Sequence, residues 1–116
     1  MRMLRIIWEY EMTRLLISPA ANEDLLSIQE YISIELSSPK AAKETIGKIL
    51  DRIKVLVDFP FSGALLENIV EFSSDYRFIV SGNYITFYRC HDDTIYVDRV
   101  IYGGRDFARI LFEDIT

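Results

Sequence analysis

Residues 76–107 read YRFIVSGNYITFYRCHDDTIYVDRVIYGGRDF, and this stretch decides the fold. Three segments within it, 76–80, 84–90 and 94–102, are rich in β-branched and aromatic residues, which favour strands. The separators SGN and HDD have the length and composition of tight hairpin loops. The stretch therefore predicts a three-stranded antiparallel meander, which ends at the Gly-Gly pair of 103–104.

Four arginines recur in this apolar stretch: Arg77, Arg89, Arg99 and Arg105. Side-chain alternation places Arg99 in line with Ile95 and Val97, in a strand where burial of a charge requires a carboxylate or carbonyl partner. Arg89 also extends an apolar stripe, on which its methylene stem can lie. These two arginines are predicted to stabilise the sheet. Arg77 and Arg105 lie at strand boundaries, where a charged group can point at a ligand.

Upstream, two Ser-Pro pairs at 18–19 and 38–39 each predict the start of a helix, because the hydroxyl can cap it and proline suits its first turn. Apolar residues then recur at helical spacing. The first stripe is Leu25, Ile28, Ile32 and Leu36, and the second is Ala42, Ile46, Ile49, Leu50, Ile53, Leu56 and Val57. The short connection between them predicts a helical hairpin, which ends at Phe59-Pro60. Apolar residues in 61–75 follow neither helical nor strand spacing, which predicts a loop with at most one helical turn.

A short strand at 14–18 precedes the hairpin, and residues 105–114 are expected to form a short helix or an irregular tail. The predicted class is α+β, with a small antiparallel sheet packed against an N-terminal helical hairpin in the order β-α-α-β-β-β-α. Residues 13–116 are predicted to form a single domain, and residues 1–12 an N-terminal extension. For this extension two alternatives stay open: translation starts at Met12, or residues 1–12 form a strand or helix that packs on the body.

Composition limits the class of protein. The chain has 116 residues, half of them hydrophobic, which is typical of one globular domain. Its net charge of -5 gives no overall attraction for nucleic acid. The single cysteine, Cys90, excludes an internal disulfide framework. No apolar run is long enough for a membrane span, and the N-terminus is a poor secretion signal. We expect a cytoplasmic protein without a membrane partner.

The order of these motifs resembles the RelE/ParE superfamily of toxins from bacterial type II toxin–antitoxin systems. The similarity covers about residues 13–112. It depends on the opening ISPAANEDLLSIQEYI at 17–32, on DFP at 58–60 followed by Gly63, and on the meander, in which IYVDRVIYGGRD matches the end of the family pattern. The resemblance implies a growth-arresting toxin that a cognate antitoxin neutralises, through a helix or extended segment laid across the hairpin and the sheet.

The superfamily contains two mechanisms. ParE-like members inhibit DNA gyrase by binding it, whereas RelE-like members are metal-independent endoribonucleases that cleave mRNA on the ribosome. The resemblance favours the gyrase-directed mechanism, because SGNYITFYR is closer to that branch and residues 76–116 carry five arginines against six acids. The expected target-binding residues are Arg77, Tyr84, Tyr88, Tyr102 and Arg105. A different target altogether is a third possibility.

The alternative is a RelE-like ribonuclease acting on ribosome and mRNA. Its candidate catalytic residues are Arg77, Arg105 and Tyr102, which would supply cations and a proton donor. Ile79 and Ile85, however, stand where the RelE-like pattern has further basic residues, and the chain ends without Tyr or His. We therefore expect a protein that is not an enzyme.

The remaining reactive residues indicate no further site. His91 and the two aspartates after it fall in one tight turn and cannot all reach a single ion, so we expect no metal site. Cys90 has no histidine partner suggested by the sequence and is expected to pack as a small residue. No phosphate-binding or zinc-binding motif is present in the sequence, so no cofactor is expected.

Overall fold

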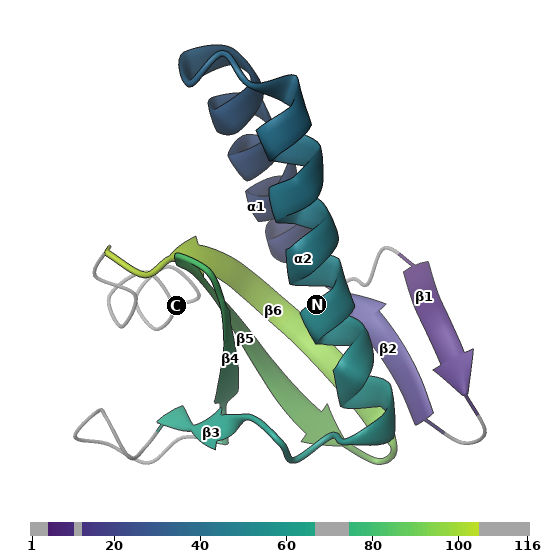
Figure 1. Ribbon diagram of the computed structural model, residues 1–116. Helices are drawn as coiled ribbons and strands as arrows, with labels where there is room; N and C mark the ends of the chain where they lie inside the picture. The colour runs from purple at the N-terminus through teal and green to yellow at the C-terminus, as the bar shows by residue number, and fades with distance from the viewer. Residues whose placement is uncertain (1–4, 11–12, 67–74, 105–116) are drawn as a thin grey trace.

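The computed structural model describes residues 5–10, 13–66 and 75–104. In chain order the elements are β1 (Arg5–Tyr10), β2 (Thr13–Ile17), α1 (Pro19–Glu30), the π-helical segment η1 (Tyr31–Glu35), α2 (Pro39–Asp58), β3 (Ala64–Leu65), β4 (Arg77–Ser81), β5 (Tyr84–His91) and β6 (Thr94–Tyr102). The strands form one sheet in the order β1-β2-β6-β5-β4-β3. The two helices lie against this sheet and extend beyond it as a hairpin (Figure 1). The predicted α+β class, with a sheet packed on a helical hairpin, is confirmed.

The predicted meander is present as β4, β5 and β6, which pair antiparallel in succession. Its turns are tight because their residues adopt left-handed backbone angles. Gly82 has φ 58°, and Asp92 and Asp93 have φ 48° and 60°. Aspartate tolerates this conformation better than most residues with a side chain, so the HDD separator forms a two-residue hairpin turn.

The sheet differs from the prediction in being mixed. β2 pairs with β6 in parallel, from Arg14 opposite Thr94 to Ile17 opposite Val97. A parallel pair needs a long crossover, which the two helices and the strands after them supply. The short strand β3 adds to β4 within the predicted loop. The predicted C-terminal helix lies outside the described residues.

An additional strand, β1, pairs antiparallel with β2 and forms one edge of the sheet. A strand or a helix was considered for the N-terminal extension, and the backbone of residues 5–10 forms a strand. The division into an extension of residues 1–12 and a domain of residues 13–116 stays a prediction.

Both helices start at the predicted serines. The Ser18 hydroxyl accepts a hydrogen bond from Ala21 N at 3.0 Å, and the Ser38 hydroxyl accepts one from Ala41 N at 3.2 Å. The first predicted stripe is wrong at its last member, because Leu36 is 56% exposed. A π-helical segment has a wider turn than an α-helix, so η1 moves Leu36 out of line with Ile28 and Ile32.

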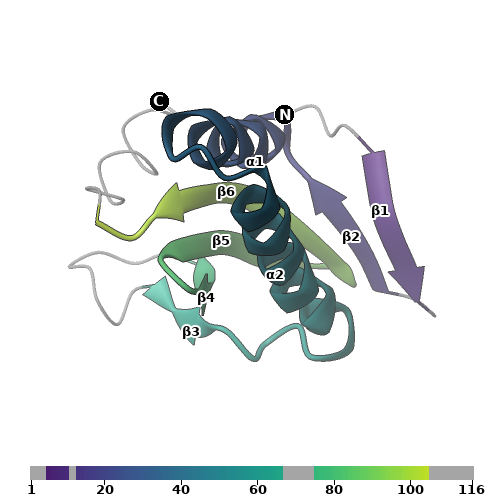
Figure 2. The ribbon, with the colours of Figure 1, turned by 45° about the horizontal axis from the view of Figure 1, so that its top comes forward.

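The helices cover one face of the sheet (Figure 2). Buried apolar residues form two clusters. The helix-side cluster joins both helices to β2, β4, β5 and β6. Its buried members are Leu15, Ile17, Ala21, Leu25, Ile28, Ile32, Ala42, Ile49, Ile53, Leu56, Val57, Ile79, Tyr88, Ile95, Val97 and Val100. The outer cluster consists of Leu66, Tyr76, Phe87 and Ile101, with Phe78 and Ile85 packed against it. The face of the sheet that points away from the helices therefore carries a second, smaller buried cluster.

A bulge in β6 changes which way its arginine points. Tyr88 lies opposite Val97 and Phe87 lies opposite Arg99, so Asp98 is the extra residue. The prediction that Arg99 shares the face of Val97 is therefore wrong, because directly opposed residues share a face and Phe87 belongs to the outer cluster.

Candidate interaction surface

A groove lies between the tip of the helical hairpin and one end of the sheet. Its volume is about 580 Å³. It is lined by Asp24, Ser27, Ile28, Tyr31, Leu36, Asn83, Tyr84, Val100, Ile101 and Tyr102. Tyr31 and Leu36 on the hairpin are 53% and 56% exposed, and Tyr102 at the end of β6 is 48% exposed. Exposed apolar side chains around a hollow of this size are typical of a binding surface.

Two of the predicted target-binding residues meet at the floor of this groove. The rings of Tyr84 and Tyr102 contact edge to face, with centroids 5.8 Å apart. Burial raises the pKa of Tyr84, and the nearby Tyr31 and Tyr102 hydroxyls raise it further. Tyr84 is therefore neutral at physiological pH and suits packing and hydrogen bonding to a partner.

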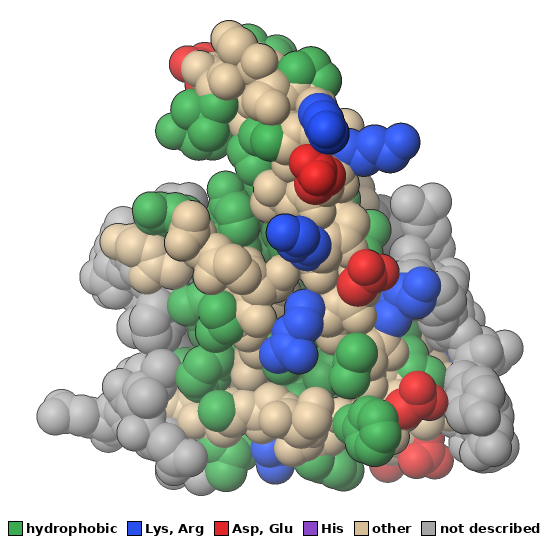
Figure 3. Space-filling model, viewed as in Figure 1, with side chains coloured by type: hydrophobic (Ala, Val, Ile, Leu, Met, Phe, Trp, Pro, Cys, Tyr) green, Lys and Arg blue, Asp and Glu red, His purple; other side chains and the backbone are tan. Residues whose placement is uncertain are grey.

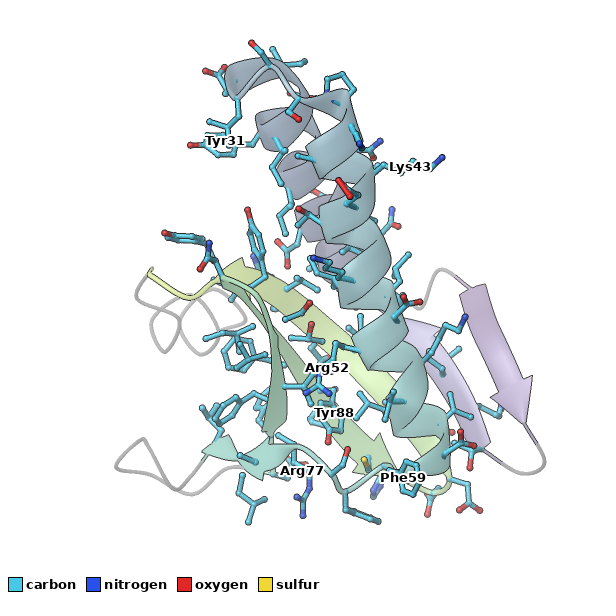
Figure 4. All side chains as sticks on the ribbon, in the orientation of Figure 1. Tyr31, Lys43, Arg52, Phe59, Arg77 and Tyr88 are labelled. Carbon is cyan, nitrogen blue, oxygen red and sulfur yellow. The ribbon has the colours of Figure 1, made fainter. Side chains whose placement is uncertain are left out.

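Arg77 lies at a different place, beside the loop that follows α2. Its guanidinium donates hydrogen bonds to the carbonyl oxygens of Phe61 and Gly63, at 3.2 and 2.8 Å. It also lies over the Phe61 ring, 5.0 Å from the centroid. Figure 4 shows Arg77 at the lower end of the molecule, far from Tyr31 at the hairpin tip. The structure thus separates Arg77 from the tyrosine pair.

Tyr88 does not reach the surface. Its side chain is 0% exposed, and its hydroxyl donates to Pro60 O and accepts from Gly63 N, both at 2.9 Å. Because these partners belong to the loop after α2, Tyr88 holds that loop to the sheet. The remaining predicted contact residue, Arg105, lies outside the described residues.

The two arginines predicted to stabilise the sheet both have carboxylate partners. Arg89 Nε lies 2.7 Å from the Oδ2 of Asp98, which is 5% exposed, and this hydrogen bond raises the pKa of Arg89. Arg99 donates from Nε and Nη2 to the two carboxylate oxygens of Asp24, at 2.8 and 3.0 Å. The prediction of a carboxylate near Arg99 is confirmed, and the bidentate pair ties α1 to β6.

Within 5–10, 13–66 and 75–104, no group of three or more His, Cys, Asp or Glu residues is placed to hold a metal ion. His91 and Asp92 project from the hairpin turn, with side chains 79% and 93% exposed. Cys90 donates to Pro60 O at 3.1 Å, and burial raises the pKa of its thiol. The thiol is therefore protonated and is a poor nucleophile.

The arrangement of a helical hairpin on a curved sheet is shared with known proteins. The sequence model of the family described as ParE toxin of type II toxin-antitoxin system, parDE, matches residues 15–107. The chain belongs to this family. It is therefore a type II toxin, and its family implies an antitoxin partner.

A solved structure of a chromosomal ParDE TA system from P. aeruginosa has the same fold as this ParE-family toxin, with a TM-score of 0.67 and 20% sequence identity. The match covers 78% of this chain and 96% of that chain. No curated protein sequence matches the chain. Neither of the described helices is long and apolar enough to cross a membrane.

Sequence reasoning missed two sets of exposed apolar residues. Tyr31 and Leu36 line the groove, and Phe59 and Phe61 protrude from the loop after α2. For the phenylalanines a signal was present in the sequence, since both flank Pro60, where the second helix is predicted to end and a loop to begin, so that no strand or helix buries them. For Leu36 there was none, because the π-helical segment that exposes it has no clear sequence signature.

Proposed function

We propose that this toxin acts in the cytoplasm by binding DNA gyrase and inhibiting it, without cleaving RNA. One observation carries the proposal: the groove beside Tyr102 is lined by aromatic, aliphatic and uncharged polar side chains and one carboxylate, and by no described arginine or lysine. The two arginines of β5 and β6, Arg89 and Arg99, are each paired with an aspartate. Such a surface suits a protein partner better than a phosphate backbone.

Cleavage of RNA would require catalytic groups in addition to a binding surface. The developing charge on the phosphate needs free cations, and the leaving oxygen needs a proton donor. Arg77 is already bonded to two loop carbonyls, and the position of Ile79 is buried and apolar. No described arginine or lysine lines the groove beside Tyr102. These contacts favour binding over catalysis.

We further propose that Tyr84, Tyr102, Arg77 and Arg105 contact the target, and that the buried Tyr88 contributes indirectly, by holding the loop to which Arg77 bonds. The Tyr84–Tyr102 pair offers a rigid aromatic surface at the groove. Aromatic and arginine side chains dominate the binding energy of many protein interfaces. The antitoxin would mask this region by lying across the hairpin and the sheet, which is one mode of peptide recognition.

The test uses one preparation of purified toxin in two assays. The first follows negative supercoiling by DNA gyrase, and the second follows mRNA cleavage on programmed ribosomes. We expect inhibited supercoiling and intact mRNA. Cleavage that disappears in Arg105→Ala would overturn the proposal in favour of the ribonuclease. Toxin mixed with its antitoxin beforehand serves as the control and should be inactive in both assays.

A further inference from the structure

The loop that follows α2 is held in one conformation by side chains from β4 and β5. It begins as a turn in which Ser62 N donates to Phe59 O at 3.1 Å, with Pro60 at the second position. The Tyr88 hydroxyl, the Cys90 thiol and the Arg77 guanidinium then bond to its backbone. A segment with this many fixed backbone contacts is preorganised.

Gly63 shows how closely this loop approaches the sheet. A Cβ at Gly63 would lie 2.5 Å from the Tyr88 hydroxyl and 2.8 Å from Phe78 O. Real Cβ atoms do not approach this closely, so only glycine fits here without movement of the backbone. The loop is therefore packed down onto the sheet.

Although its backbone is fixed, the loop leaves two large apolar side chains in solvent. Phe59 is 62% exposed and Phe61 is 67% exposed, and Val55 on the last turns of α2 is 42% exposed. We call these three residues the aromatic corner. Rigid aromatic groups lose little conformational entropy when a partner covers them, which makes them efficient anchors.

The aromatic corner continues a stripe along α2. Lys48, Arg52, Val55 and Phe59 follow one another at intervals of four, three and four residues, so they lie on one side of the helix. Figure 3 shows Lys and Arg side chains along the exposed face of α2, with Asp and Glu side chains interspersed among them. The stripe thus has a basic half, Lys48 and Arg52, and an apolar half.

The basic half of the stripe is not neutralised within the described part of the chain. Among the described residues, neither Lys48 nor Arg52 forms an ion pair, and Arg52 donates from Nε to Val80 O at 3.2 Å. By contrast, α1 and η1 contain four acidic residues and no basic one. In a chain of net charge -5, a basic stripe on α2 is a local exception. Glu44 lies four residues before Lys48 on the same side of α2, so the basic half of the stripe ends at Lys48.

We infer that this stripe and the aromatic corner form a docking surface for an acidic segment of a partner protein. Carboxylates of the segment bind Lys48 and Arg52, and apolar side chains of the segment pack on Val55, Phe59 and Phe61. Arg77, held over the Phe61 ring, provides a further cation at the lower end. The surface is distinct from the groove beside Tyr102, which shares none of these residues.

The probe is a fluorescein-labelled amphipathic peptide in which two glutamates are followed by two leucines, at the same four-three-four spacing. Binding is measured by fluorescence anisotropy, and amide shifts of the isotopically labelled toxin locate the contact. We expect shifts at residues 48–63, and binding that weakens as salt is raised, because screening reduces exposed ion pairs. A peptide with lysine in place of each glutamate should not bind.

Matched variants test the two halves separately. Phe59→Ala with Phe61→Ala should weaken binding by about tenfold or more, and Arg52→Gln by about threefold. Leu26→Ala, at an apolar side chain 57% exposed on α1, and Lys40→Gln should have no effect. All five substituted residues are exposed, and unchanged unfolding midpoints confirm intact folding. Shifts confined to the groove, equal binding by the lysine peptide, or no binding at all would each overturn the inference.

Discussion

The hydroxyl of Tyr88 links the most buried part of β5 to the loop after α2. In Tyr88→Phe the ring still fills the helix-side cluster, but Gly63 N and Pro60 O lose their partner. We expect a loss of about 1 to 2 kcal/mol in the free energy of unfolding, the usual result of leaving such groups unsatisfied. Urea denaturation measures it. Tyr102→Phe, whose ring is 48% exposed, is the control and should change little; equal losses in both variants would contradict the role given to the Tyr88 hydroxyl.

The raised pKa of Tyr76 predicts how the free energy of unfolding changes at alkaline pH. Its side chain is 8% exposed, and burial, followed by the charge of Asp98, raises its pKa from 10.0 to about 12. Between these values the folded state keeps a proton that the unfolded state has lost. Stability conferred by the neutral phenol is therefore complete below pH 10 and falls as pH rises toward 12, by up to about 1.4 kcal/mol for each pH unit.

This dependence is measured by chemical denaturation at a series of pH values from neutral to alkaline. Tyr76→Phe cannot ionise at this position, so its stability should fall less steeply above pH 10 than that of the parent protein. The other buried tyrosines still titrate, so some slope remains. Identical slopes for the two proteins would show that the ionisation of Tyr76 is not coupled to folding.

At the scale of elements, Asp24 joins α1 to the last part of β6, beyond its pairing with β2. Its carboxylate accepts two hydrogen bonds from Arg99 and a third from Val100 N at 2.8 Å. Asp24→Ala leaves a partly buried guanidinium and a backbone donor without this acceptor. We expect a loss of about 2 to 3 kcal/mol in the free energy of unfolding. Glu23→Ala, at the exposed neighbour, should cost under about 0.5 kcal/mol. A similar loss in both would mean that the helix alone, and not the link to β6, is affected.

The strand β1 offers a second test at this scale. Among the described strands it pairs with β2 alone, and it lies outside the range of the family match. We propose that a chain beginning at Met12 keeps the rest of the sheet. Hydrogen exchange should then speed up at the β2 amides, while β5 and β6 keep their protection, because local opening follows local pairing. Loss of protection in all strands would instead make β1 part of the cooperative domain.

Local signals in the sequence predicted the elements whose causes are local. The Ser-Pro pairs set both helix starts, and the β-branched and aromatic segments placed the three strands of the meander. The parallel pairing of β2 with β6, the bulge at Asp98 and the strand β3 depend on residues far apart in the chain, so no local pattern specifies them. The groove beside Tyr102 was only partly predicted. Leu36 is exposed because it follows the π-helical segment η1, which has no clear sequence signature.

At the scale of the whole molecule, β5 holds two apolar clusters together. Phe87 packs in the outer cluster and Tyr88 in the helix-side cluster, so consecutive residues join opposite faces. Folding and the proposed target binding would depend on different residues, because the clusters are buried whereas the groove presents Tyr102 to solvent. Loss of toxicity can arise from damage to either, and only measurements of both properties on the same variant distinguish them.

Phe87→Ala and Tyr102→Ala make that distinction. Removal of the fully buried Phe87 ring should cost about 3 to 5 kcal/mol, a large part of the stability of a small domain. Tyr102→Ala should change stability by only about 0.5 kcal/mol, yet weaken gyrase binding about tenfold if Tyr102 is an interface anchor. Growth arrest, unfolding midpoint and inhibition of supercoiling are measured for both. A Tyr102→Ala protein that folds normally and still inhibits gyrase fully would exclude the groove as the target contact. A Phe87→Ala protein of undiminished stability would mean that the outer cluster does not hold the sheet together.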